Sequence, residues 1–156
     1  MKIAKIVILV ILAMCLILLI NYKTKHDPEK AKPYLNQGKT LFGEGKIDDA
    51  IAAYEKGINE NSCSSEGHNL LGIAYRSKYM GSKDKKFLNK TVSSFKKSID
   101  CDPKNWYPYI NLGTTYYYTD KKQDAVPYLK KGLEVNPQNP EAAKIVEMID
   151  EGTKAK

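Results

Sequence analysis

The sequence repeats one short pattern, and this repeat limits the folds that the chain can adopt. Asn69–Tyr75 reads NLLGIAY and Asn111–Tyr116 reads NLGTTY, so Leu-Gly is followed by Tyr three residues later in both segments. The spacing continues downstream: from Gly113, small or helix-ending residues fall 12, 19 and 24 positions on, at Ala125, Gly132 and Pro137. Recurrence at fixed spacing indicates copies of one supersecondary unit.

The same offsets define three units along the chain. From Gly38 they give Ala50, Gly57 and Ser62, while from Gly72 the match runs seven residues late. The units therefore cover residues 31–64, 65–105 and 106–139; two contain 34 residues and the middle one contains 41.

This 34-residue pattern resembles the tetratricopeptide repeat, a helix–turn–helix unit. The resemblance implies an all-α solenoid of three helical hairpins, with residues 140–156 forming a capping helix and tail. In such a hairpin, Gly38, Gly72 and Gly113 let the first helix approach the second. The residues expected to leave room for the first helix of the next unit are Gly57, Ser98 and Gly132. The apolar face expected for the cap consists of Ala142, Ile145, Val146 and Ile149, and its polar face of Glu141, Lys144, Glu147 and Asp150.

The seven extra residues of the second unit lie near Gly81-Ser82, where we expect the turn. Seven residues are about two helical turns, so one turn added to each helix keeps both apolar faces in register. The result is an elongated hairpin, or a protruding basic tip that touches a partner or lipid headgroups. The lysines of this tip are Lys78, Lys83, Lys85 and Lys86. In the third unit, we expect Pro127 to delay or bend the second helix.

The N-terminus carries an apolar run, residues 6–20. Residues 6–22 would span about 25 Å as a helix, which is enough for a short bilayer crossing. We therefore predict a transmembrane signal anchor over residues 1–22, followed by a linker over residues 23–30. This makes the chain a single-pass membrane protein with its domain outside the cytoplasm, although a cytoplasmic domain, a cleaved signal peptide and a lipoprotein signal stay open as alternatives.

The resemblance also implies the function, which is to bind a peptide or protein segment in the concave groove without catalysis, in a scaffold or assembly role. In this groove, Lys39 and Arg76 are expected to hold a carboxylate, and the tyrosines to hold apolar side chains. The expected groove residues are Lys39, Phe42, Asn69, Ile73, Arg76, Tyr107, Ile110, Asn111, Thr114 and Tyr117. One subclass of the family clamps the acidic C-terminal tail of chaperones with Lys, Asn and Arg. Here those clamp positions hold Leu35, Lys39, Leu70, Tyr107 and Asn111, so we do not predict that ligand.

Composition limits the other functions. The net charge of +7 allows an alternative, a basic repeat domain that binds nucleic acid or an anionic lipid surface. The lysines are scattered, however, so we do not expect nucleic acid binding. The two histidines, His26 and His68, are expected to have structural roles, and we predict no enzyme, metal or cofactor. The sequence does not indicate the partner or the oligomeric state.

Two cysteines lie where the ends of the second hairpin are expected to meet. Cys63 ends the first unit and Cys101 ends the second helix of the second unit, so the two thiols could form a disulfide. Two independent thiols are the preferred interpretation.

Overall fold

The computed structural model describes residues 2–155, with side chains described for residues 6–17 and 26–155. The described chain is helical throughout, apart from short connections. Its helices are α1 (Lys2–Lys25), α2 (Pro28–Gly43), α3 (Ile47–Glu60), α4 (Ser65–Ser82), α5 (Lys85–Cys101), α6 (Tyr107–Tyr117), α7 (Lys122–Val135) and α8 (Ala142–Lys154).

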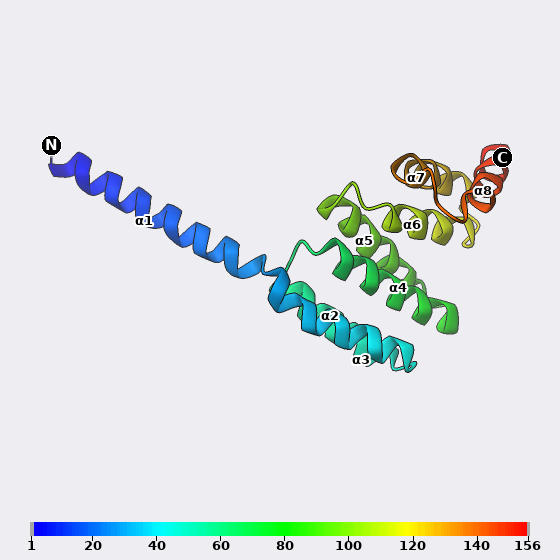
Figure 1. The fold of residues 1–156 in the computed structure, drawn as a ribbon, viewed down its shortest axis with the longest axis horizontal. Coiled ribbons are helices and arrows are strands. Elements are labelled where there is room, and N and C mark those ends of the chain that lie inside the picture. Colours follow the sequence, from blue (N-terminus) through cyan, green and yellow to red (C-terminus); the bar gives the residue numbers. More distant parts are fainter. Residues whose placement is uncertain (1, 156) are drawn as a thin grey trace.

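The helices after α1 form antiparallel hairpins that stack in chain order (Figure 1). The pairs α2–α3, α4–α5 and α6–α7 make the tightest contacts, each hairpin packs on the next, and α8 packs on α7. The described part of the chain has eight helices, and α2–α8 form an all-helical solenoid of three hairpins and a capping helix, so the predicted repeat architecture is confirmed. Helix α1 extends away from this array (Figure 1).

Glycines at the repeat positions allow the two helices of each hairpin to approach closely. A Cβ atom on Gly72 would lie 2.6 Å from Cε1 of Phe95, and one on Gly113 would lie 2.6 Å from Cδ2 of Leu129. Gly38 faces the ring of Tyr54 in the same way. The facing side chains are fully buried, so alanine at these positions would force the hairpins apart.

The small residues Gly57, Ser98 and Gly132 contact a different helix from the one we expected. A Cβ atom on Gly57 would lie 2.6 Å from Cδ2 of Leu35, and Gly132 faces Ile110. Both partners lie on the first helix of the same unit, not on that of the next unit. Ser98 follows this pattern, because its hydroxyl donates to the carbonyl oxygen of Ser65 at 2.7 Å. The prediction of an inter-unit role was therefore wrong.

The turn of the long hairpin lies at Lys83-Asp84, just after the expected position at Gly81-Ser82. Helix α4 continues through Gly81-Ser82, where the Ser82 hydroxyl donates to the Lys78 carbonyl oxygen at 2.8 Å. The helix ends at Lys83, which adopts a left-handed conformation (φ 58°), and Asp84 caps α5 through the Lys86 amide. Both helices are lengthened, at 18 and 17 residues, against 11 and 14 in the third hairpin.

Proline and linker positions also differ from expectation. Helix α7 begins at Lys122, nine residues after Gly113, just as α3 begins nine residues after Gly38, so Pro127 does not delay it. Pro127 is exposed and lies in the first half of a continuous helix. The expected linker over residues 23–30 is short, because α1 ends at Lys25 and α2 begins at Pro28.

The membrane prediction is corrected. Helix α1 contains the predicted anchor, and its described side chains, residues 6–17, are exposed. The flanking side chains of residues 1–5 and 18–25 lie outside the described set. No helix in the described part of the chain is both long and apolar enough to cross a membrane. On this finding, the prediction of a single-pass membrane protein with an extracytoplasmic domain is wrong.

Cys63 and Cys101 are joined by a disulfide, with their Cα atoms 5.2 Å apart. The bond links the loop before α4 to the last residue of α5, so it closes the open end of the second hairpin. The preferred interpretation of two independent thiols is replaced by this pairing. Cys15 on α1 is a free thiol.

Candidate functional site

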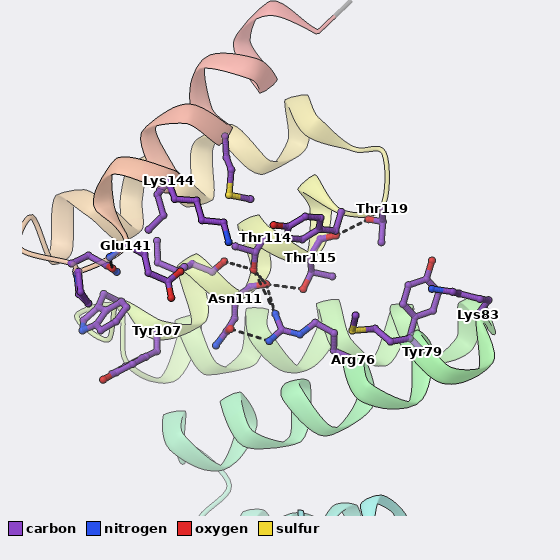
Figure 2. Close-up of a pocket in the computed structure, with 18 residues that line it drawn as sticks. Arg76, Tyr79, Lys83, Tyr107, Asn111, Thr114, Thr115, Thr119, Glu141 and Lys144 are labelled. Carbon is purple, nitrogen blue, oxygen red and sulfur yellow. Dashed lines mark hydrogen bonds between the residues drawn. The ribbon is translucent and has the colours of Figure 1, made fainter. Parts of the chain in front are cut away.

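A cavity of about 580 Å³ lies on the inner side of the stacked hairpins. Its walls come from the C-terminal half of α4, from α6, and from α8 (Figure 2). Three separate elements of the chain therefore meet in one hollow, as expected for the concave surface of a solenoid.

Arg76 of α4 forms one wall of the cavity and points toward α6 (Figure 2). Its guanidinium donates to the carbonyl oxygen of Asn111 at 3.4 Å, to Oδ1 of Asn111 at 3.3 Å and to the Thr114 hydroxyl at 3.5 Å. The Phe95 ring lies 5.7 Å from the guanidinium carbon, within cation–π range. Burial lowers the pKa of the Arg76 guanidinium, which nevertheless stays charged.

Asn111 connects Arg76 to the next hydrogen bond in the groove. Its side-chain amide donates to Oδ1 of Asn69 at 3.0 Å, which leaves its own Oδ1 atom facing Arg76. Thr114 donates to the carbonyl oxygen of Ile110 at 2.9 Å. The side chains beside the guanidinium are therefore held in place before any ligand arrives.

The rim of the cavity is apolar and exposed. Met80, Tyr107 and Tyr118 line it and have exposed fractions of 65%, 54% and 67%. Tyr107 stacks on Trp106 with ring centroids 3.8 Å apart, which gives one edge of the cavity a flat aromatic surface. Large apolar side chains that stay exposed around a cavity are typical of binding sites.

The cavity contains half of the residues that we expected in the groove. These are Arg76, Tyr107, Ile110, Asn111 and Thr114. The expected residues that do not line it are Lys39, Phe42, Asn69, Ile73 and Tyr117.

Three of the expected residues outside the cavity, Lys39, Phe42 and Tyr117, have other partners. Lys39 forms an ion pair with Glu66 at 2.5 Å, and Phe42 packs against the core of the first two hairpins. The Tyr117 hydroxyl donates to Glu151 on α8 at 2.6 Å, and Lys122 pairs with the same carboxylate at 2.6 Å. These two bonds hold the pKa of Glu151 below its usual value. Tyr117 therefore faces the α7–α8 contact, and its neighbour Tyr118 faces the cavity.

Several cavity residues were missed because we treated α8 only as a cap. Lys144, Ile145 and Met148 of this helix and its N-cap residue Glu141 line the cavity, at the spacing of one helical face. Lys144 was expected on the outer polar face, yet it reaches toward the middle of the cavity (Figure 2). Val146 was expected in the buried face and is 47% exposed, whereas Met148 is 4% exposed.

The basic tip of the long hairpin carries less unpaired charge than its sequence indicates. Lys78 pairs with Asp48 of the first hairpin, and Lys86 pairs with Asp84 at 3.0 Å. Lys78 and Lys86 also lie over the Phe87 ring, each 4.9 Å from its centre. These contacts favour the elongated hairpin over a free cationic knob.

His68 occupies a structural position within the fold. His68 is buried, and its Nε2 atom lies 3.1 Å from the carbonyl oxygen of Ser62, in the loop that carries the disulfide. Burial lowers the pKa of His68, and the nearby charge of Lys97 acts in the same direction.

Comparison with known families identifies the repeating unit. Residues 31–62 and residues 94–126 each match a family model described as Tetratricopeptide repeat. The array of hairpins is therefore TPR-like. The matched segments fall in the first unit and across the junction of the second and third units.

Known proteins share this fold at low sequence identity. Mouse sperm-associated antigen 1 is 24% identical over 131 residues, which cover 81% of this chain but only 14% of that protein. The first TPR of Spaghetti (RPAP3), solved with the HSP90 peptide SRMEEVD, superposes with a TM-score of 0.72 at 21% identity, covering 84% of this chain and 98% of that one. The TPR2B domain of yeast Sti1, solved with an Hsp70 peptide, gives 0.69 at 18% identity over 82% of this chain and 99% of that one.

Proposed function

We propose that this chain is a protein-interaction module that binds an extended segment of a partner protein in the cavity between α4, α6 and α8. One observation carries the proposal. Outside α1, four large apolar side chains of the described residues are strongly exposed, and three of them, Met80, Tyr107 and Tyr118, surround this single cavity. A partner segment that covers them would remove apolar surface from water, which favours association.

Charge in the cavity supports a ligand with an acidic group. Arg76, Lys83 and Lys144 line it, against one acid, Glu141. Its polar groups are placed to orient a main chain or side chain, and none of the lining residues forms the acid–base or nucleophile arrangement of an enzyme. The proposed role is therefore binding without catalysis, in a scaffold or an assembly factor.

The structural neighbours support a peptide ligand, since several were solved with HSP90 or HSP70 peptides. The chaperone tail itself is not the proposed ligand. Of the five clamp positions, Leu35 is 4% exposed and Leu70 packs against the core, while Lys39 is paired with Glu66. Tyr107 and Asn111 also lack the cationic side chains that such a clamp requires.

The test is a selection of displayed random 12-residue peptides on the full chain, in a mild detergent because the described side chains of α1, residues 6–17, are exposed and mostly apolar. The variant Tyr107→Ser with Tyr118→Ser removes two exposed rim rings and should leave the core intact. Losing an aromatic hot spot costs about 2 kcal/mol, and ~1.4 kcal/mol is a factor of ten, so selected peptides should bind the variant far more than tenfold more weakly.

The matched control is Val146→Ser, which removes an apolar side chain that is 47% exposed and does not line the cavity. Selected peptides should bind this control as they bind the wild-type chain. A selection that yields no peptide, or peptides that bind the rim variant and the wild type equally, would show that the cavity is not the binding site.

A further inference from the structure

Two cations from opposite walls of the cavity have no acid partner. Arg76 comes from α4 of the second unit, and Lys144 comes from the capping helix α8 (Figure 2). In the described part of the chain, neither side chain forms an ion pair. The cavity thus contains positive charge that the protein does not neutralise.

Arg76 is poorly compensated for a half-buried cation. Its three hydrogen bonds go to neutral oxygens of Asn111 and Thr114, at 3.3 to 3.5 Å. A guanidinium has five N–H donors, and its bonds to a carboxylate are shorter and about twice as strong as neutral ones. Because Phe95 covers one side of the guanidinium and Asn111 fixes its orientation, Arg76 is preorganised for an anion.

The other cations near the groove are less suited to complete such a site. Lys39 is already paired with Glu66, and Lys83 lies over the Tyr79 ring, 5.8 Å from its centre. Glu141 stands at the Tyr107 end of the cavity, away from Arg76 (Figure 2). Its negative charge disfavours an anion at that end, so the attraction is strongest between Arg76 and Lys144.

We propose that Arg76 and Lys144 form one anion subsite that takes the carboxylate side chain of a Glu or Asp within the partner segment. The capping helix is then part of the binding surface and sets its specificity. The inference rests on the proposed function, because it names the chemistry of the ligand for the same cavity. An apolar side chain of the same segment would lie against the exposed Met80 and Tyr118.

The experiment compares peptide selections on the full-length wild type, on Lys144→Glu and on Lys130→Glu. Lys130 is exposed on α7 and does not line the cavity, so its variant makes the same change in net charge away from the subsite. Peptides selected on the wild type and on Lys130→Glu should share an acidic residue beside an apolar one. Peptides selected on Lys144→Glu should lose this preference.

A second measurement uses one peptide from the wild-type selection and its Glu→Gln copy, with binding followed by fluorescence polarisation. The wild type should prefer the acidic peptide by at least about tenfold, and this preference should disappear in Lys144→Glu and in Arg76→Gln. Circular dichroism melting of each variant checks that the fold is retained.

The outcomes separate the two proposals. If selected peptides need the aromatic rim but show no acidic preference, the anion subsite is overturned while the proposed function stands. A preference that survives Lys144→Glu unchanged also overturns the subsite. If the wild type selects no peptide, the proposed function fails, and the inference fails with it.

Discussion

Removing the disulfide should cost a large part of the stability of the repeat domain. The bond joins residues separated by 38 positions. The chain-entropy relation for a loop of this size gives about 13 cal/mol/K, or about 4 kcal/mol at 25 °C. Cys63 is exposed and Cys101 is half-buried, so replacing both by serine should add little further loss from packing. Small domains have ~5–15 kcal/mol of total stability, so this loss is substantial.

The measurement is urea unfolding of Cys63→Ser with Cys101→Ser, followed by far-ultraviolet circular dichroism. The background should be Cys15→Ser, which removes the exposed free thiol of α1 and prevents cross-linking between chains. With a typical urea slope of about 2 kcal/mol/M, the midpoint should fall by about 2 M. Dithiothreitol added to the Cys15→Ser protein should lower the midpoint to the same value.

Two results would contradict this reasoning. A loss below about 1 kcal/mol in the double variant would mean that the bond does not constrain the unfolded chain as the entropy relation requires. An absence of any effect of the reductant would mean that the two thiols are not joined in the folded protein.

Three further predictions concern packing and protonation. Gly152→Ala should destabilise the docking of α8 and lower the unfolding midpoint, since the new Cβ would lie 2.5 Å from the Lys122 carbonyl oxygen, a backbone atom that cannot move aside. Leu129→Ala should cost about 2–5 kcal/mol in urea unfolding, because Leu129 is fully buried. Burial lowers the pKa of His68 from its ordinary 6.5, so its protonation favours the unfolded chain. The stability that neutral His68 contributes should be complete above pH 6.5 and should fall as the pH drops toward the folded pKa, and His68→Gln should flatten urea midpoints between pH 7.5 and 5.

The repeat architecture could be predicted from the sequence because close helix packing requires small residues at fixed offsets. Gly38, Gly72 and Gly113 each face a large buried side chain of the partner helix, and no larger residue fits there. The contacts of Gly57 and Gly132 were harder to assign. Spacing alone shows that a close approach exists, but it does not say whether the approaching helix belongs to the same unit or to the next one.

The candidate site could be predicted only in part, because periodicity does not identify all the partners of a side chain. Lys39 lies on the expected helix, but an ion pair with Glu66, 27 residues away, occupies it. Tyr117 and Tyr118 are adjacent and similar, and only the contact of Tyr117 with Glu151 shows which of them faces the cavity. Such choices depend on contacts between distant segments.

The orientation of α8 about its own axis shows how a packing contact can shape a candidate binding site. The apolar residues of this helix fit two stripes: one contains Ile145, Val146 and Ile149, and the other contains Ile145, Met148 and Ile149. Gly152 favours burial of the second stripe. Only glycine at this position lets the Gly152 side of α8 lie against the backbone of Lys122. When the second stripe is buried, Lys144, which lies four residues before Met148 on the same face of α8, is directed toward the cavity. A substitution that disturbs the Gly152 contact should therefore weaken peptide binding as well as stability, although Gly152 does not line the cavity.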